Sequence, residues 1–194
     1  MNDRLRKQLD FMLELDKMKN LYRQTYVLHE DRKENDAEHS WHIAVLASLL
    51  AEYSNEPIDV AHVTKMVLLH DVVEIDAGDT YCYDTDGYKT KADREEKAAQ
   101  RIFGLLPDDQ RDEYYKLWRE FEDSVTPDAR FAAVLDRIQP LLLNYTKGGI
   151  SWQEHGVFKE QVLGRNIPYF SASDELAAAI KEVIDDAYAQ GWLK

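Results

Sequence analysis

The sequence predicts an all-α protein, a single-domain helical bundle of six or more helices spanning residues 1–194. Apolar residues recur every three or four positions, as Leu5, Leu9, Met12 and Leu13 do in the first segment. No stretch of useful length alternates apolar and polar residues as a half-buried strand would. With 194 residues and 44% hydrophobic content, the chain is long enough to bury one sizeable core.

Capping and helix-breaking residues set the limits of the expected elements. Pro57 and Pro107 interrupt helices, Asp59 is a suitable N-cap, and Thr126 followed by Pro127 is typical of a helix start. In chain order we expect a helix in the first segment, a polar loop over 29–36, helices over 37–53 and 60–71, a loop rich in Gly, Asp and Tyr over 77–90, and helices over 91–106, 108–123 and 128–145.

The C-terminal part is expected to end in a helix that packs on the bundle. Gly148 and Gly149 predict a turn after the preceding helix. Ser171 and Asp174 resemble a capping box, although aspartate replaces the usual Glu or Gln, so the last helix is expected over 171–190.

Composition excludes several functional classes. The formal net charge of -13 argues against binding of duplex nucleic acid, which requires a basic face. It leaves room for a small anionic substrate, because a metal ion and one arginine can form a local positive pocket. The single cysteine, Cys82, excludes an internal disulfide and a cysteine-built metal site. The chain contains neither an apolar run of membrane-spanning length nor a signal-peptide core at its N-terminus, so we expect a cytoplasmic protein.

Two histidines are placed to face inward. His39 lies at the centre of the helical stripe formed by Ile43, Leu46 and Leu50. His70 continues the stripe of the following helix, which also predicts a buried ring. A lone buried histidine is more often a core residue bonded to a carbonyl than a ligand, so His39 alone would not establish a metal site.

The carboxylates near His70 strengthen the case for a metal. Asp71 ends an apolar helix, where an ionised carboxylate needs a cation or a full set of donors. Glu74 projects into the same region, one turn after His70. Solvation at an exposed helix C-terminus is the alternative, but the helix dipole disfavours two acids there. Asp136 lies off the centre of its own apolar stripe, so spacing alone does not select it.

The segments AEHSWHIAVLA, MVLLHDVVEIDAGD and AVLDRIQPLL together resemble the HD-domain phosphohydrolases, and more closely their 5'-deoxynucleotidase branch. The resemblance is strongest over residues 5–146, and the extended HDxxExxxGD string is its most specific part. It implies an all-α bundle, a homodimer and one divalent metal ion held by His39, His70, Asp71 and Asp136.

The same resemblance assigns the remaining site residues. Glu74 takes the place of the catalytic carboxylate, Asp79 that of a second acid near the substrate, and Arg23 that of an arginine on the substrate phosphate. This branch usually has tryptophan directly after that arginine, where this chain has Gln24. That tryptophan helps to shape the sugar pocket, so the preference for deoxyribose over ribose is open.

The chemistry fits hydrolysis of (deoxy)nucleoside 5'-monophosphates by a metal-activated water. A divalent ion binds phosphate oxygens and lowers the pKa of a bound water. A carboxylate such as Glu74 moves the proton, and an arginine such as Arg23 binds the phosphate. Metal identity, base preference and the physiological substrate stay open at this stage.

Three alternatives are also open. The first is another HD hydrolase, acting on a cyclic nucleotide, a guanosine polyphosphate or a nucleoside triphosphate. The second is a two-metal HD oxygenase or phosphodiesterase, which needs extra histidines between Asp71 and Asp136; this chain has none there, which argues strongly against that class. The third is a non-catalytic, metal-containing nucleotide-binding regulator. Four protein ligands would leave open positions on a six-coordinate ion, which favours catalysis.

Overall fold

The computed structural model describes residues 1–84 and 86–194, and Thr85, in the expected loop over 77–90, lies outside this part. The α-helices are α1 (Asp3–Leu15), α2 (Asp36–Leu49), α3 (Val60–Leu69), α4 (Glu74–Ala77), α5 (Tyr88–Phe103), α6 (Asp108–Asp123), α7 (Pro127–Thr146), α8 (Ile150–His155), α9 (Lys159–Asn166) and α10 (Asp174–Ala189). Short 3-10 helices are η1 (Asp16–Asn20), η2 (Ala51–Tyr53), η3 (His70–Val73) and η4 (Ile167–Ala172), and the strands are β1 (Tyr22–Tyr26) and β2 (Lys33–Asn35).

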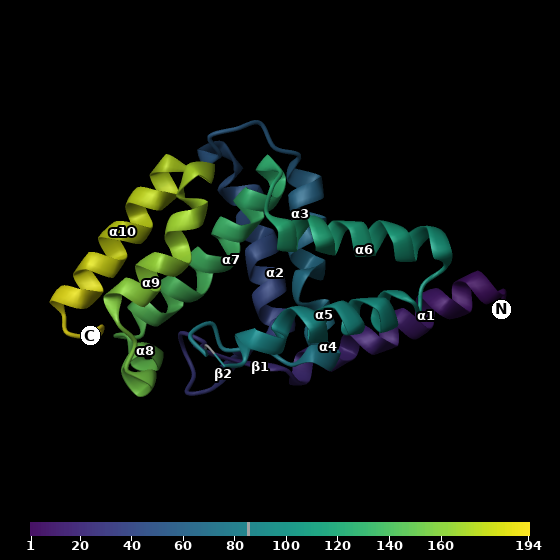
Figure 1. Ribbon diagram of the computed structural model, residues 1–194, viewed down its shortest axis with the longest axis horizontal. Helices are drawn as coiled ribbons and strands as arrows, with labels where there is room; N and C mark the ends of the chain where they lie inside the picture. The colour runs from purple at the N-terminus through teal and green to yellow at the C-terminus, as the bar shows by residue number, and fades with distance from the viewer. Residues whose placement is uncertain (85) are drawn as a thin grey trace.

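Helix α7 is the centre of the bundle. It contacts α2, α3 and α6 on one side and α10 on the other, as Figure 1 shows. Most of its residues are buried, including Phe131, Leu135 and Ile138. A helix that is buried around most of its circumference presents more than one face to its neighbours. This explains how an acid off its main apolar stripe can still face inward.

The predicted all-α class is confirmed, with one local addition. Strands β1 and β2 pair antiparallel, so part of the expected loop over 29–36 is a strand. Helix α2 begins at Asp36 with a capping box: the Asn35 side chain accepts from the backbone N–H of Glu38, and the Glu38 carboxylate accepts from that of Asn35. The hairpin was missed because β2 is three residues long, too short for a period to appear.

The helical winding becomes tighter at His70 and Asp71. The helix expected over 60–71 ends as α3 at Leu69, and His70 and Asp71 continue in the 3-10 helix η3. Asp59 caps α3 as expected, accepting from the backbone N–H groups of Ala61 and His62. Helix α5 begins at Tyr88, inside the segment expected to be a loop.

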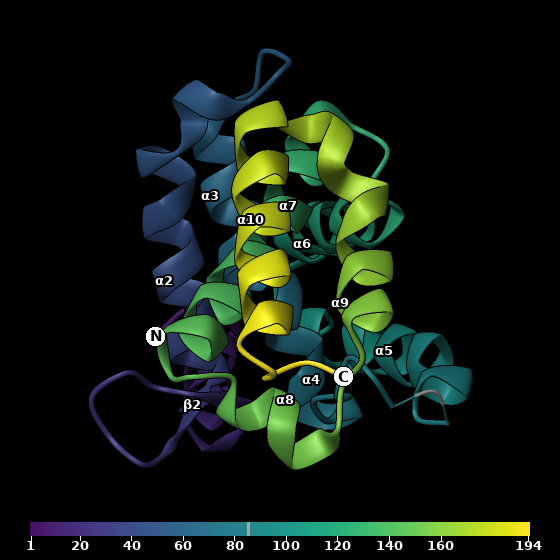
Figure 2. The same ribbon diagram turned by 90° about the vertical axis from the view of Figure 1, so that its left-hand side faces the viewer.

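The C-terminal segments cover α7 from the other side. Helix α10 packs against α7 and α9, and Figure 2 shows α10 in front of α7 with α9 beside it. Its N-cap is Ser173, which accepts from the backbone N–H of Leu176, and not Ser171 as expected. Gly148 and Gly149 both adopt positive φ in the turn before α8, which glycine tolerates without strain. In the described part of the chain no helix combines the length and apolar character needed to cross a bilayer.

Candidate active site

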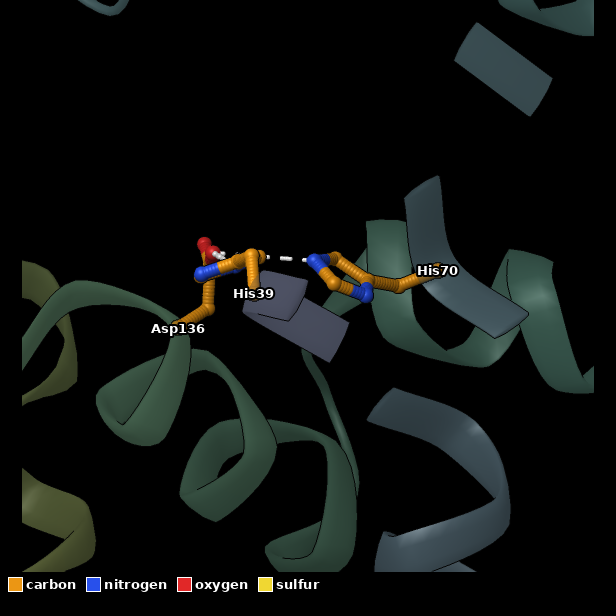
Figure 3. A group of neighbouring side chains, drawn as sticks. All are labelled: His39, His70 and Asp136. Atoms are coloured by element: carbon orange, nitrogen blue, oxygen red, sulfur yellow. Dashed lines mark hydrogen bonds and ion pairs between the residues drawn. The ribbon is translucent and has the colours of Figure 1, made fainter. Parts of the chain in front are cut away.

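Side chains from three segments converge beside α7. The Nε2 atom of His39, on α2, lies 3.0 Å from Oδ1 of Asp136, on α7. The Nε2 atom of His70 lies 3.0 Å from Oδ1 of Asp71 and 3.6 Å from Oδ1 of Asp136. Figure 3 shows the two imidazoles and the Asp136 carboxylate pointing toward one another. The structure therefore brings together all four residues expected to hold a metal.

The outer nitrogens of both rings are held by hydrogen bonds. Nδ1 of His70 lies 2.8 Å from the carbonyl oxygen of Val67, to which it can only donate. Nδ1 of His39 lies 2.9 Å from Oε1 of Gln139, whose amide nitrogen donates to Glu34 at 2.6 Å. Partners of this kind fix the tautomer and orientation of metal-binding imidazoles. Each ring is left with an Nε2 lone pair directed at the cluster.

This donor set fits a divalent ion. The Nε2 atom of His70 is buried and faces carboxylate oxygens without the geometry of a hydrogen bond. Ligand atoms of His39, His70 and Asp136 lie within 4.8 Å of one another. Ligands about 2.1 Å from an octahedral ion lie about 3 Å apart. This is close to the 3.0 and 3.6 Å that separate the Nε2 atoms of His39 and His70 from Oδ1 of Asp136. The same charges favour a cation at this point. Burial lowers the pKa of His70, but the carboxylates of Asp71 and Asp136 outweigh it and raise this pKa to about 10.

A second group of acids adjoins the cluster. Carboxylate oxygens of Asp36, Asp71 and Glu74 lie within 4.8 Å of one another, and all three residues are buried. Burial, together with the negative charges of Asp71 and Asp79, raises the pKa of Glu74 well above its usual value. Burial and the charge of Asp71 likewise raise the pKa of Asp36 to about 7. Acids that hold protons near neutral pH are suited to acid–base chemistry.

Arg23, on β1, reaches the same acids. Its Nη1 lies 2.7 Å from Oδ2 of Asp71 and 3.5 Å from Oδ1 of Asp36, and its Nη2 lies 4.0 Å from Oδ1 of Asp136. Burial alone would lower the pKa of Arg23, but the carboxylates of Asp71, Asp79 and Glu74 raise it well above its usual value. The strand thus places a permanent cation at the edge of the cluster.

The cluster opens into a cavity of about 280 Å³. Arg23, Asp71, Glu74, Asp79 and Asp136 line one part of it, together with His70 and Gln24. The Gln24 side chain accepts a hydrogen bond from Lys33 of β2. Tyr22 and Tyr26, the aromatic residues nearest to Gln24 in sequence, do not line the cavity. The aromatic residues that line it are Tyr81, Tyr83, Tyr88, Phe121, Trp152 and Tyr169.

Two further arginines line the cavity, Arg137 next to Asp136 and Arg165 on α9. The Nη1 of Arg137 lies 3.4 Å from Oδ2 of Asp136, and its guanidinium stacks 3.8 Å from the ring centroid of Tyr169. Burial lowers the pKa of Arg137, the Asp136 carboxylate opposes this shift, and the positive charge of Arg165 adds to it. Both guanidinium groups line the same cavity.

Sequence reasoning missed several of these groups. Gln139 lies three residues after Asp136, and that spacing on one helix could have identified it as a partner. Glu34 and Asp36 lie in a stretch whose polarity predicted a solvated loop, yet both are buried. Arg165 carried no local signal. His42 accepts a hydrogen bond at Nδ1 from the Gln139 amide.

Comparison with known proteins gives consistent matches. A family model described as HD domain matches residues 15–177. The human protein named 5'-deoxynucleotidase HDDC2 is 30% identical over 138 residues, 71% of this chain and 66% of its own length. Its mouse counterpart is 30% identical over 112 residues, 58% of this chain and 55% of its own length. The chain thus spans less than two-thirds of the length of these curated relatives.

A solved structure matches over nearly the whole chain. It is described as a "Predicted metal-dependent phosphohydrolase" from Magnetospirillum magnetotacticum and is 48% identical, with a TM-score of 0.93. The match covers 98% of this chain and 95% of that one. Similarity at this level extends to both the helices that carry the cluster and those that enclose the cavity.

Proposed function

This chain belongs to the HD domain family, and on that premise we propose that it is a metal-dependent phosphohydrolase that removes the 5'-phosphate from nucleoside monophosphates. One observation carries the proposal: two imidazole Nε2 atoms and two carboxylates converge beside a cavity that an arginine also lines. The names of the human and mouse relatives support a nucleotide substrate for this site.

Each residue has a defined task in this proposal. His39, His70, Asp71 and Asp136 would hold one divalent ion, which when bound polarises phosphate oxygens and acidifies water. Glu74, whose pKa is raised by burial, would exchange a proton with the attacking water or the leaving oxygen. Nearby Asp79, whose pKa burial also raises, would be the second acid.

Arg23 would bind the phosphate. A guanidinium gives bidentate, charge-assisted hydrogen bonds to phosphate oxygens. Its present partners are carboxylates of the cluster, Asp71 above all. Once those carboxylates coordinate a cation, the guanidinium is available to a substrate anion at the same position.

The size of the cavity supports a small substrate. A volume of about 280 Å³ lies near the lower end of the range for small-molecule sites, roughly 300–1,000 Å³. Its aromatic lining offers surfaces on which a base could stack. Both features favour a mononucleotide over a guanosine polyphosphate or a nucleoside triphosphate.

The test is an assay of phosphate release. Metal-stripped protein would be supplied with Mn, Co, Mg or Zn and offered deoxy- and ribonucleoside 5'-monophosphates, a cyclic nucleotide, a guanosine polyphosphate and a nucleoside triphosphate. We expect metal-dependent release of phosphate from the monophosphates. Turnover of only one of the other substrates would assign a different HD hydrolase activity, and binding without turnover would indicate a nucleotide-binding regulator.

We further propose that the chain forms a homodimer. Helix α2 exposes an apolar stripe on its outer side, where Trp41, Val45 and Leu49 are 64%, 47% and 63% exposed. These residues are four positions apart and share one face of the helix. A contiguous apolar stripe of this kind is suited to a protein contact, and a second copy is the partner that the family resemblance implies. The cytoplasmic location expected from the sequence stays a prediction.

A further inference from the structure

Two cationic side chains of the cavity have no task in the mechanism above. Arg137 follows Asp136 on α7, and Arg165 comes from α9. They come from segments 28 positions apart, so their meeting is a product of the fold.

Arg137 is largely buried and incompletely paired. Its side chain is 13% exposed, and its Nη1 donates to the carbonyl of Ala133 at 2.7 Å. Its Nε is buried without a hydrogen-bond partner. The acid it approaches is Asp136, whose other oxygen already faces the two histidines. A buried guanidinium with an unused N–H is expected to bind a further acceptor.

Arg165 lacks a carboxylate of its own. Its Nη1 donates to the hydroxyl of Tyr88 at 2.9 Å, and the described residues show no ion pair between Arg165 and a carboxylate. The other cations of the cavity differ, since Lys91 pairs with Glu95 at 2.6 Å and Arg23 with Asp71 at 2.7 Å. Two guanidinium groups that line one sheltered cavity repel each other unless an anion lies between them.

The position of the pair relates it to the metal cluster. Oδ1 of Asp136 lies 3.0 Å from His39, while Oδ2 lies 3.4 Å from Arg137. The guanidinium is therefore next to the proposed ion, across a single carboxylate. An anion bound at the cluster would lie within reach of Arg137 on that side, while Arg23 would approach from the side of Asp71.

The charges of the site support the same conclusion. A divalent ion is neutralised by Asp71 and Asp136, which leaves Arg23 as the positive charge at the cluster. A phosphomonoester is dianionic near neutral pH, so one arginine does not balance it. Arg137 and Arg165 line the same cavity and can supply the missing positive charge.

We propose that Arg137 and Arg165 form a second phosphate-binding wall, which holds the oxygens of a phosphomonoester dianion on the Oδ2 side of Asp136, whereas Arg23 pairs with Asp71. The inference rests on the proposed phosphohydrolase function and adds two binding residues to it. Paired guanidinium groups suit this task because each gives two parallel N–H donors to phosphate oxygens. Tyr169 and Tyr88 act as positioning residues, the first by stacking on Arg137 and the second by its hydroxyl contact with Arg165.

The test measures binding of inorganic phosphate by calorimetry to the metal-loaded protein, so it does not depend on turnover. Arg137→Gln and Arg165→Gln should each weaken phosphate binding by about tenfold or more, the loss expected for a charge-assisted contact. The matched control is Arg111→Gln, an arginine of α6 paired with Asp108 and Asp112 on the surface, which should leave binding unchanged. Metal content measured on every sample excludes an indirect effect through Asp136.

Unchanged phosphate affinity in both variants, with the metal retained, would overturn the proposal, whatever the nucleotide assay shows. Weakened phosphate binding together with no phosphate release from any monophosphate by the wild type would leave the pair standing and remove the proposed function. If a glutamine variant fails to fold, Tyr88→Phe decides. Tyr88 is 41% exposed, and its loss should weaken phosphate binding several-fold by releasing Arg165. No change in that variant would count against the pair.

Discussion

The Nε2 atom of His39 lies 3.0 Å from Oδ1 of Asp136, although 97 positions separate the two residues in the sequence. The other nitrogen of the same ring lies 2.9 Å from the amide oxygen of Gln139, one turn further along α7. One helix thus supplies both a ligand of the proposed ion and the group that orients another ligand. The cluster is built as a unit, so its supporting residues should matter almost as much as its ligands.

Replacing Gln139 tests this support. Gln139→Leu removes the acceptor for Nδ1 of His39 and leaves Glu34 without its amide donor. We expect metal affinity to fall roughly 10–100-fold, as is typical when an outer partner of a metal-binding histidine is lost. Competition with a chromogenic chelator measures this. Gln100→Leu, at an exposed position of α5, is the matched control and should bind metal as the wild type does. Equal affinity in the two variants would show that Gln139 has no orienting role.

Replacing Glu74 separates metal binding from turnover. Glu74 lies next to the cluster, in contact distance of Asp71 and Asp36, and its pKa is raised by burial. Glu74→Ala should keep the metal and reduce kcat on the order of 10²–10⁴-fold, the usual contribution of a general acid or base. Metal analysis and phosphate release on the same sample measure the two effects. Near-normal turnover would make Glu74 a bystander and direct attention to Asp79.

The sequence predicted the placement of some of these residues and not of others. The helical stripe of α2 placed His39 inward, and it is fully buried. Spacing did not place Asp136, because α7 is buried on most sides and no single stripe marks its inner face. The family resemblance selected that residue, and its side chain does reach the histidines.

Other features depend on contacts that no local pattern records. His70 and Asp71 lie in a 3-10 helix, although the apolar spacing predicted that the α-helix continues through them. Arg165 and Arg137 line the same cavity because α9 and α7 both border it. Gln139 was missed although it lies at helical spacing from Asp136, since a glutamine within an apolar helix carries no chemical signature of its own.

Gln24 should set the selectivity for the sugar. Gln24 lines the cavity, and its amide oxygen accepts a hydrogen bond from Lys33. The family pattern has a tryptophan at this position. A packed indole can leave a 2'-hydroxyl unpaired at a cost of roughly 1–3 kcal/mol, whereas an amide can bond it. We therefore expect a small ratio of kcat/KM for dAMP over AMP in the wild type and a larger one in Gln24→Trp.

That comparison has a clear contrary outcome. The sequence left open that Tyr22, Tyr26 or Trp41 might replace the indole, but Trp41 and Tyr22 are exposed and the Tyr26 hydroxyl donates to Glu154. A strongly deoxy-selective wild type that Gln24→Trp leaves unchanged would show that another part of the cavity excludes ribose.

The outer face of α2 should control the oligomeric state. Val45→Glu places a charge in the middle of the exposed stripe between Trp41 and Leu49. If this stripe pairs two copies, the variant should become monomeric by light scattering while its circular dichroism and metal content stay unchanged. Val125→Glu, at a site 71% exposed before α7, is the matched control and should leave the mass unaltered. An unchanged mass in Val45→Glu, or a monomeric wild type, would exclude α2 as the dimer face.

The central claim is that His39, His70, Asp71 and Asp136 hold one divalent ion, and metal content per chain tests it most directly. Protein purified without chelator and analysed by mass spectrometry of the elements should contain one transition-metal ion per chain. Asp71→Ala should lose that ion, because Asp71 supplies an oxygen 3.0 Å from Nε2 of His70. Two ions per chain, none in the wild type, or full occupancy in Asp71→Ala would contradict the account.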